Sequence, residues 1–453
     1  MTAAPRRVAV VGSGIAGLGA AAQLAAHAQV VLFEADSHFG GHAHTVDLSL
    51  PGPAGRNVTH GVDTGFLVFN HATYPQLVKL FADLAVPTAA SEMSFSVQVP
   101  QIGLEWSGCN LDTVFAQRSN LFKPRFLGML RDLMRFNRIT TQIAEQGDAD
   151  AQDAELQQPI GDFLLAHRFS NAFRDWYLLP MLGCIWSCPT DQMLRFPVAT
   201  MIRFCHNHGL IRVTDRPQWH TVQGGSREYV RRLLQRIPDA RLNTAVTGVR
   251  RVPPASGSAG VWVDTADGSS LFDAVVLAGH SDQSLALLGT QASADERAVL
   301  GAIRYHRNRA VLHTDSALLP KRQKAWAAWN YERSALASQE QSAVCLHYLL
   351  NRLQPLPWAQ PVVVSLNPTR EPAASTVHGE FDYAHPVFDA AAITAQERLP
   401  SIQGQSNIWF AGAWTRYGFH EDGLRSGLAV ADALRAQWAA EAAGADSPVR
   451  VAA

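Results

Sequence analysis

The clearest hydrophobic pattern lies in the first forty residues of the chain. Residues 8–11 and 29–33 are apolar, valine-rich runs typical of parallel strands that are buried on both faces. The alanine-rich residues 15–26 between them predict a helix. No Asp, Glu, Lys or Arg occurs from residue 8 to residue 33, but four glycines and several polar residues interrupt the run and argue against a membrane helix or signal peptide. The order strand, helix, strand predicts the start of a doubly wound α/β domain.

Apolar periodicity also predicts the elements of the rest of the chain. From residue 110 to 208 apolar positions recur at helical spacing, with one helix starting at Pro159 and a broken segment at 183–189. Further helices are expected at 73–84, after Gly224-Gly225, and from Gly423 onward. Alternating or apolar runs between turn residues predict a hairpin tip within 48–60 and strands at 94–99, 102–106, 245–249, 261–263, 271–279, 309–315, 325–331, 345–350, 361–366 and 407–412.

Three glycines give the first predicted turn a chemical role. In the register of Gly12, Gly14 and Gly17, the first permits a tight turn, the second lets a phosphate approach the backbone, and the third lets the helix pack on the strand. Glu34 ends the second strand about 20 residues after Gly14, where a carboxylate accepts hydrogen bonds from a ribose hydroxyl. This combination predicts a dinucleotide site with a helix N-terminus facing the pyrophosphate.

Composition narrows the class of protein. A length of 453 residues with 47% apolar residues indicates a globular chain with a large core, in one very large domain or two to three ordinary ones. A formal net charge of −1 argues against a nucleic-acid partner. Five cysteines without a secretory signal favour a reducing compartment and no disulfides, so we expect a cytoplasmic protein, including one held peripherally at the inner membrane face.

The helical stretch from residue 110 to 208 leaves two interpretations open. Its apolar, aromatic face is typical of a plain helical core. The same face suits a tunnel for a long hydrophobic substrate, with the interspersed arginines at a membrane or phosphate-headgroup surface. No metal site is expected there, because the spacing of its cysteines and histidines is not that of a zinc site; these residues are Cys184, Cys188, Cys205, His206 and His208.

Motifs at both ends of the chain resemble one known superfamily. Gly40-Gly41 follows Glu34, residues 61–66 read Gly-Val-Asp-Thr-Gly-Phe, and near the C-terminus a strand ends at Gly412 before the helix at Gly423. In this order they resemble the flavin-containing amine oxidoreductases, which include amine oxidases, protoporphyrinogen oxidases and phytoene desaturases. The resemblance implies noncovalently bound FAD.

The resemblance also implies a fold and a division into domains. The fold class is α/β with an α+β substrate part: a Rossmann-like ββα FAD-binding domain of the amine oxidase type, with an inserted helical and sheet substrate domain. The FAD-binding domain is expected to be discontinuous, formed by residues 1–70, 216–285 and 401–440. The substrate domain is expected from residues 71–215 and 286–400, and residues 441–453 are expected to form a flexible tail.

The FAD contacts implied by the resemblance come from both ends of the chain. In the superfamily an arginine usually follows the Gly-Gly pair, whereas His42 stands there in this chain. Val246 is expected beside the adenine, and the helix N-terminus at Gly423 at the pyrimidine edge of the flavin. The full set is Gly12, Gly14, Ile15, Ala16, Gly17, Glu34, Ala35, Gly40, Gly41, His42, His44, Thr45, Asp63, Thr64, Gly65, Phe66, Val246, Gly279, Gly412, Ala413, Glu421, Asp422, Gly423, Leu424 and Ser426.

The candidate catalytic residues stand where this chain departs from amine oxidases. Those enzymes commonly carry an aromatic residue three positions before the flavin-edge glycine, where this chain has His420, and a lysine near flavin N5, where it offers Arg309 or Asn308. Losing an aromatic cage argues against amine oxidation. His420 is either a general acid/base or a structural hydrogen-bonding group. Asn330 and Tyr331 are further candidates on a strand expected to face the flavin.

A narrower resemblance covers nearly the whole chain. Residues 40–45, 62–70, 312–315, 329–331 and 420–423 resemble bacterial FAD-dependent proteins whose genes lie beside cyclopropane-fatty-acyl-phospholipid synthases. It implies an oxidoreductase that oxidises or desaturates an unsaturated, cyclopropane or methylated fatty-acyl lipid chain by hydride transfer to flavin N5. A lipid methyltransferase or cyclopropane synthase is the implied partner. The alternatives are a carotenoid- or porphyrinogen-type desaturase and a non-catalytic FAD-binding partner of a lipid methyltransferase.

Overall fold

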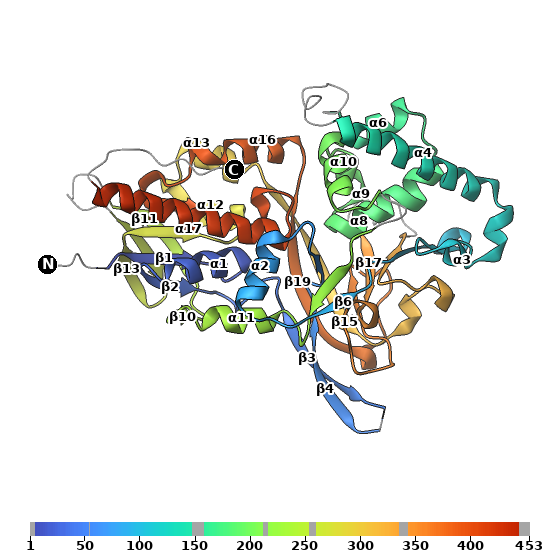
Figure 1. Ribbon diagram of the computed structural model, residues 1–453, viewed down its shortest axis with the longest axis horizontal. Coiled ribbons are helices and arrows are strands. Elements are labelled where there is room, and N and C mark those ends of the chain that lie inside the picture. The colour runs from blue at the N-terminus through green and yellow to red at the C-terminus, as the bar shows by residue number, and fades with distance from the viewer. Residues whose placement is uncertain are drawn as a thin grey trace.

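Two lobes make up the molecule in the computed structural model, which describes residues 5–53, 55–146, 158–211, 216–252, 260–334 and 343–443 (Figure 1). The first lobe contains the N-terminal strand and the long C-terminal helix. The second lobe contains a large sheet and most of the helices between residues 111 and 207. One hydrophobic cluster runs through both lobes, so they share a continuous core.

A five-stranded parallel sheet forms the centre of the first lobe. Its order is β10 (Asp239–Arg241), β2 (Gln29–Phe33), β1 (Arg7–Val11), β14 (Ala274–Leu277) and β20 (Ile408–Phe410). Every neighbouring pair in it is parallel. All four residues of β14 are buried, as expected for a strand with both faces covered. The sheet therefore joins segments from the beginning, the middle and the end of the chain.

Successive residues of a strand are buried on opposite faces of the parallel sheet. Val8 and Val10 of β1 belong to the cluster with α1 (Ile15–Leu24) and α17 (His420–Ala442), whereas Ala9 belongs to the cluster on the opposite face. α1 and α17 approach closely, because a Cβ at Gly427 would lie 2.1 Å from the carbonyl oxygen of Ala16. The opposite face is covered by β11 (Val246–Arg251), β12 (Val261–Thr265), β13 (Gly268–Phe272), α12 (Ser281–Leu288), α13 (Ala294–Leu300) and α16 (Ala390–Arg398).

A seven-stranded sheet forms the second lobe. Its order is β19 (Val377–Val387), β15 (Arg304–His313), β18 (Val363–Leu366), β17 (Cys345–Leu349), β16 (Trp329–Glu332), β7 (Phe95–Val99) and β8 (Leu104–Ser107). Neighbours are antiparallel except β16 and β7. β19, an eleven-residue strand at the sheet edge, was not predicted. β15 starts five residues earlier than predicted, and residues 325–328 are not a strand.

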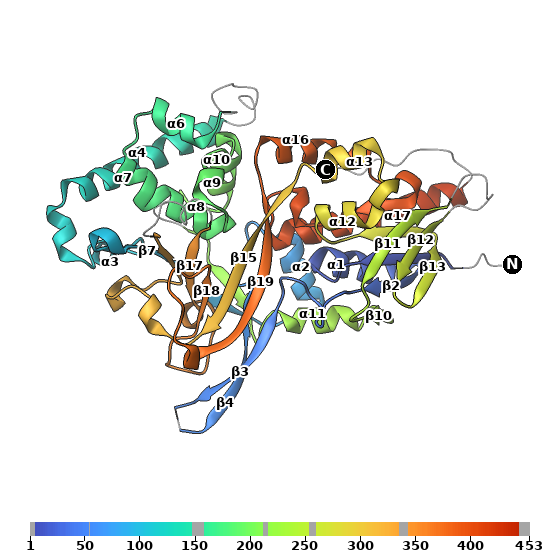
Figure 2. The same ribbon diagram turned by 180° about the vertical axis from the view of Figure 1, so that it is seen from behind.

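Helices cover the second lobe at the end away from the N-terminus (Figure 2). α8 continues four residues into the segment predicted to be broken and ends where Ser187 adopts a left-handed φ of 49° before Pro189. A π-helical turn at Arg174–Leu178 precedes it. The helices are α3 (Leu111–Val114), α4 (Pro124–Gln146), α6 (Ile160–Ala166), α7 (Asn171–Phe173), α8 (Leu179–Trp186), α9 (Thr190–Met193) and α10 (Val198–Asn207).

The remaining elements join the lobes. The hairpin of β3 (Thr45–Pro51) and β4 (Asn57–Asp63) extends from the molecule in both views (Figures 1 and 2). A small sheet of β5 (Phe69–Asn70), β9 (Trp219–Val222) and β6 (Thr88–Ser91) lies between the lobes, with α2 (Pro75–Asp83), α11 (Arg227–Leu234) and α15 (Leu350–Leu353) nearby.

The contacts differ in part from the predicted division of the chain. α2, α13 and α16 were assigned to the substrate domain, but α2 packs on α17, and α13 and α16 pack on the nucleotide-binding sheet through their apolar faces. The predicted tail begins inside α17, which continues to Ala442; residues 444–453 lie outside the described part. Among the described residues no helix is both long enough and apolar enough to cross a bilayer.

Candidate functional site: a cleft between the lobes

A single cleft of about 1330 Å³ runs between the two lobes. Its first-lobe lining comes from the turn before α1, the Gly-Gly segment, residues 64–68, Val246, the start of α12 and residues 412–423. The second lobe contributes β19 and parts of β16, β17, α8 and α10. A pocket for one drug-sized ligand usually has about 300–1,000 Å³, so this cleft has room for a large cofactor together with a substrate.

The glycine turn before α1 is shaped to receive an anion. Gly12 has a left-handed φ of 101°, and a Cβ at Gly17 would lie 1.9 Å from the carbonyl oxygen of Gly12. At Gly14, by contrast, a Cβ would meet no protein atom within 4 Å. Gly14 lines the cleft and caps a helix whose first turn has no acidic residue. No side chain of the first helical turn itself therefore competes with an anion for the backbone N–H groups at the start of α1.

Glu34 lies beside this turn at the end of β2. Its buried carboxylate accepts hydrogen bonds from the backbone N–H and hydroxyl of Ser13 and from the backbone N–H of Asp36. The hydroxyl of Ser13 in turn accepts from the backbone N–H of Gly40. Glu34 thus connects the glycine turn to the Gly-Gly segment and places a fixed carboxylate on the cleft wall.

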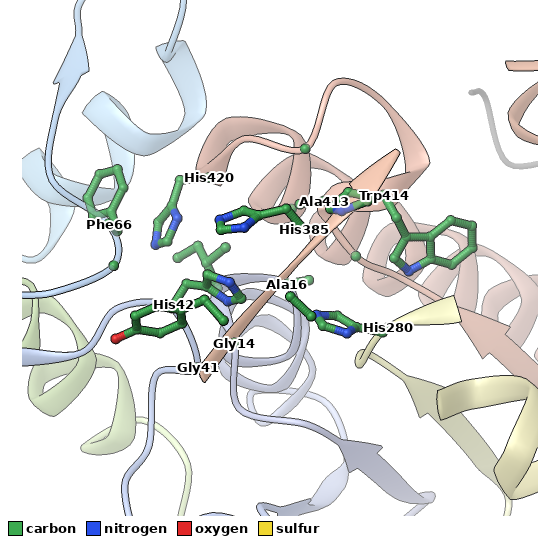
Figure 3. Close-up of a pocket in the computed structure, with 18 of the residues that line it drawn as sticks. Gly14, Ala16, Gly41, His42, Phe66, His280, His385, Ala413, Trp414 and His420 are labelled. Carbon is green, nitrogen blue, oxygen red and sulfur yellow. The ribbon is translucent and has the colours of Figure 1, made fainter. Parts of the chain in front are cut away.

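Histidines surround the middle of the cleft (Figure 3). The ring centroid of His42 lies 5.4 Å from that of His385 and 6.3 Å from that of His280. Nε2 of His42 is buried without a hydrogen-bond partner among the described residues. Burial, with these neighbouring rings, holds the pKa of His42 well below its usual value and lowers the pKa of His385 to about 4. Both rings are neutral at pH 7.

His420 occupies the cleft next to the first turn of α17. Its ring stacks on Phe66 with centroids 3.8 Å apart (Figure 3). Its Nε2 lies 2.8 Å from the hydroxyl of Tyr229. Burial lowers the pKa of His420 to about 3 and raises that of Tyr229 well above its usual value. Both groups are therefore neutral at pH 7, and one hydrogen bond joins the Tyr229 hydroxyl to Nε2 of His420. This arrangement supports the structural interpretation of His420, not the interpretation as a general acid/base near neutral pH.

A second group of lining residues forms an uncharged wall. Phe204 stacks on Phe419, the neighbour of His420, with centroids 4.9 Å apart, and Trp329 meets Tyr348 edge to face at 5.1 Å. Burial lowers the pKa of His208 to about 4, so this histidine is also neutral. The wall consists of Met93, Cys184, Ile185, Ser187, Phe204, His208, Leu210, Trp219, Trp329, Tyr348, Leu366 and Phe419, and none of these described residues is charged at pH 7.

Most of the predicted FAD contacts line the cleft. The structure brings together Gly12, Gly14, Ile15, Ala16, Glu34, Ala35, Gly40, Gly41, His42, His44, Thr64, Gly65, Phe66, Val246, Gly279, Gly412, Ala413 and Gly423. These residues come from regions more than 400 positions apart in the chain. The convergence of Gly14 and Gly423 on one cleft is what the resemblance required.

Seven predicted contacts lie outside the cleft lining, where each stabilises the surrounding framework. Asp63 accepts from Thr45, from Ser226 and from Gln354, and burial raises its pKa to about 6. Glu421 accepts from two backbone N–H groups at the start of α2, and Asp422 accepts from that of Phe419. The residues outside the lining are Gly17, Thr45, Asp63, Glu421, Asp422, Leu424 and Ser426.

Three of the four predicted catalytic residues also lie away from the cleft. Arg309 is 37% exposed and forms ion pairs with Glu371 and Glu380. Asn330 is buried and hydrogen-bonded to Ser96, Ala327 and the carbonyl of His347. Tyr331 is also buried, on the strand face opposite to Asn330. Among the predicted catalytic residues only His420 lines the cleft.

Several cleft residues escaped the prediction from sequence. Tyr383 and His385 lie on β19, and Asn308 of β15 donates to Nδ1 of His385. Residues 377–387 alternate polar or charged side chains with larger aromatic ones, which is the signal that indicates a strand. His280 and Tyr229 carried no local signal. Among the described residues, no three or more His, Cys, Asp or Glu side chains are grouped so that they could bind a metal ion. The cysteines at 184, 188 and 205 are free and buried.

Comparison with known proteins assigns this fold to a class. The family model of flavin-containing amine oxidoreductases matches residues 15–305, and the chain belongs to that family. Comparison of the sequence with curated proteins finds no match. Like its family, the chain is an FAD-dependent oxidoreductase.

Solved structures of this fold cover almost the whole chain. A CLA-producing fatty acid isomerase from P. acnes is 15% identical, covers 93% of this chain and 97% of its own, and has a TM-score of 0.64. A putative protoporphyrinogen oxidase from Exiguobacterium sp. 255-15 is 16% identical, covers 96% and 99%, and has a TM-score of 0.66. Cyclohexylamine oxidase from Brevibacterium oxydans IH-35A is 15% identical, covers 96% and 100%, and has a TM-score of 0.66.

The cleft fits FAD by the chemistry of its first-lobe lining. The open space at Gly14 and the N-terminus of α1 suit a diphosphate, and the carboxylate of Glu34 suits a ribose. The buried and unpaired Nε2 of His42 supplies a polar atom for the same ligand. These residues would hold the cofactor, while the uncharged wall near His420 remains for a substrate.

Proposed function

We propose that this enzyme oxidises or desaturates a long, hydrophobic fatty-acyl chain. The observation that carries the proposal is the uncharged wall, which begins beside His420 and continues through Phe419 and Phe204 into the second lobe. Binding of a ligand to this wall is favoured by burial of apolar surface and disfavoured by burial of an unpaired charge. A fatty-acyl chain satisfies both conditions.

The same wall argues against the other substrates of this family. An amine cation at the wall would lose its hydration without meeting a carboxylate of the wall, and the site has a neutral histidine, His420, where an aromatic cage residue stands in amine oxidases. A porphyrinogen carries carboxylates, and the wall has no lysine or arginine to pair with them. The charged residues of the cleft lining, among them Arg307 on β15 and Asp382 on β19, lie outside the wall. A carotenoid also meets the requirements of the wall, so it is the second candidate substrate.

The residues of the chain have defined roles in this proposal. When bound, FAD supplies the capacity to accept a hydride from a carbon–hydrogen bond. The uncharged wall aligns the acyl chain and excludes water from the reacting carbon. Tyr229 fixes the orientation of the His420 ring through the hydrogen bond at Nε2. Because His420 is neutral, it adds no charge that would repel an apolar chain.

One solved structure of the same fold suggests a related outcome. The isomerase from P. acnes acts on a fatty acid, as its description states. In such a reaction the acyl chain is rearranged without net oxidation. A fatty-acyl substrate is compatible with both oxidation and isomerisation. The two reactions differ in whether the flavin is left reduced at the end. A lipid methyltransferase or cyclopropane synthase remains the proposed partner.

The test is anaerobic mixing of the FAD-loaded protein with defined lipids. Phospholipids with unsaturated, cyclopropane or methylated acyl chains are compared with a carotenoid, a porphyrinogen and primary amines. We expect only the acyl lipids to be converted. If the reaction is an oxidation, the visible absorbance of the flavin is lost; if it is an isomerisation, that absorbance recovers after the reaction. Bleaching by an amine, a porphyrinogen or a carotenoid but by no acyl lipid would refute the proposal. A protein whose flavin no compound reduces, but which changes the rate of a lipid methyltransferase, would be the non-catalytic partner.

A charged substitution in the wall tests the proposal, and the same substitution outside the wall is its matched control. Ile185→Arg places a cation in the wall, so we expect loss of lipid turnover with retention of bound flavin. Thr59→Arg introduces the same side chain on the exposed face of the β3–β4 hairpin and should leave turnover unchanged.

A further inference from the structure

Exposed apolar side chains are concentrated in one part of the molecule. Among the described residues every large hydrophobic side chain with high exposure lies between positions 102 and 165, in the second lobe. Phe122 is 85% exposed and Leu111 is 78% exposed. A single exposed apolar side chain is ordinary, but several gathered in one region mark an interaction surface. The full set is Ile102, Leu111, Leu121, Phe122, Leu127, Met134 and Leu165.

Five of these residues share one end of the lobe. The side chain of Gln117 accepts from the backbone N–H of Glu105 and donates to the carbonyl of Gly103, next to Ile102. Arg118 pairs with Asp112, next to Leu111. These bonds hold the turn at Arg118–Phe122 against α3 and the start of β8, so that the segments carrying Ile102, Leu111, Leu121 and Phe122 are brought together. Leu127 follows one helical turn later on α4.

The place of this end in the molecule suits contact with a large, flat partner. α3 and the start of α4 form the extremity of the second lobe farthest from the N-terminus in both views (Figures 1 and 2). We call the residues 102, 111, 121, 122, 123, 127, 131, 134 and 138 the tip patch. No other lobe extends past it in either view.

Cations lie among the apolar residues of the tip patch. Leu127, Arg131, Met134 and Arg138 recur at helical spacing and all are exposed, which gives α4 a solvent face of alternating apolar and basic residues. Residues 111–138 contain six cations and two carboxylates in a chain whose formal net charge is −1. Of the two carboxylates, Asp112 pairs with Arg118 and Lys324, and Asp132 is buried beside Arg135.

The exposed cations of α4 are not neutralised within the described part of the chain. Arg131 and Arg138 form no ion pair there, and Lys123 at the start of the helix forms none either. An exposed apolar patch with unpaired cations fits the boundary between the headgroups and acyl chains of an anionic bilayer. A protein partner of ordinary surface would leave these cations without counter-charges.

We propose that the tip patch docks the enzyme on an anionic phospholipid surface. Phe122, Leu121 and Leu111 enter the boundary of the acyl chains, while Lys123, Arg131 and Arg138 meet the lipid phosphates. No spanning helix is involved, in line with the helices described above. The proposal concerns binding to a surface and holds for any substrate of the cleft, so it stands or falls separately from the proposed lipid chemistry.

The test is sedimentation of the FAD-loaded protein with vesicles. We expect binding to vesicles of phosphatidylcholine mixed with phosphatidylglycerol, weaker binding to phosphatidylcholine alone, and a loss of binding as salt is raised. Phe122→Ser with Leu111→Ser should weaken binding at least tenfold. Arg131→Gln with Arg138→Gln should weaken it about tenfold or more, because each cation near an anionic surface contributes roughly a factor of five.

Two controls keep the experiment decisive. Arg56→Gln removes an exposed cation from the β3–β4 hairpin, away from the tip patch, and should leave vesicle binding unchanged. The visible flavin spectrum and the thermal midpoint show whether the serine and glutamine variants remain folded. Equal binding by wild type and folded variants would overturn the proposal. So would self-association in solution that the same substitutions abolish without any binding to vesicles, because the patch would then be an interface between copies of the chain.

Discussion

Two glycines in the same turn should respond to alanine in opposite ways. Gly17→Ala places a Cβ 1.9 Å from the carbonyl oxygen of Gly12, so the backbone of the turn must move. Overpacking of this kind typically costs about 1–3 kcal/mol, and a contact with backbone belongs at the upper end. We therefore expect the thermal midpoint of the FAD-free protein to fall by several degrees.

Gly14→Ala should leave the FAD-free protein intact. Gly14 has φ −60° and ψ 173°, which alanine adopts readily, and its Cβ would meet no protein atom within 4 Å. The loss of a glycine cap and the gain in backbone rigidity are each about 0.5–1 kcal/mol and have opposite signs. FAD must share the same space as the new methyl group, and a penalty of about 1–3 kcal/mol corresponds to a 5- to 150-fold weaker affinity.

The assay combines thermal unfolding of the FAD-free protein with fluorescence titration of FAD. Gly128→Ala on α4 is the matched control, because a Cβ there also meets nothing within 4 Å but lies outside the cleft. The reasoning is refuted if Gly14→Ala binds FAD as tightly as wild type, or if it lowers the midpoint as much as Gly17→Ala does.

Three further predictions concern the charged groups and the histidines. An anionic diphosphate favours protonated rings at His42 and His385, whose pKa values are lowered in the free protein, so FAD binding should take up protons. The affinity for FAD should then rise as the pH falls from 8 to 5, by up to about tenfold per pH unit for each proton taken up. Riboflavin, which lacks the diphosphate, should show no such rise. The His42→Arg variant should show a weaker dependence of FAD affinity on pH. Arg309→Ala should leave turnover and FAD affinity unchanged and lower stability by less than about 1 kcal/mol, since its ion pairs are exposed; a loss of turnover by stopped-flow would return Arg309 to the reaction. Glu34→Ala leaves the donors of Ser13 and Asp36 without their acceptor, so FAD affinity should drop at least tenfold by fluorescence quenching, and an unchanged affinity would show that the carboxylate plays no part.

The parts of the site that sequence predicted well are those coded by local patterns. Gly12, Gly14 and Glu34 lie within one strand–helix–strand unit, whose geometry depends on neighbours in the chain. Gly412 and Gly423 form a second local unit at the other end. Each unit faces the cleft because parallel strands of one sheet end at the same edge.

The parts that sequence predicted poorly depend on strand parity and long-range pairing. The resemblance to amine oxidases placed a catalytic position on β15, but it did not determine which side chains of β15 point toward the cleft. Arg309 turns toward Glu371 and Glu380, while its neighbour Asn308 contacts His385 in the cleft. A shift of one residue reverses the face of a strand, so a correct strand still gave an incorrect side chain. β19 carries a local alternation that indicates a strand, but its partner, β15, begins more than 60 residues earlier, so its place beside the cleft had no local signal.

The position of β20 at the end of the nucleotide-binding sheet has a consequence for biosynthesis. This strand pairs only with β14 among the described strands and leads directly into Gly412 and α17. A ribosome must therefore release the chain through β20 and the start of α17 before the cofactor cradle can close. Nascent chains that stop before residue 408 would present an unpaired sheet edge and an open nucleotide site, so chaperones and proteases have a long interval in which to act on flavin-free intermediates.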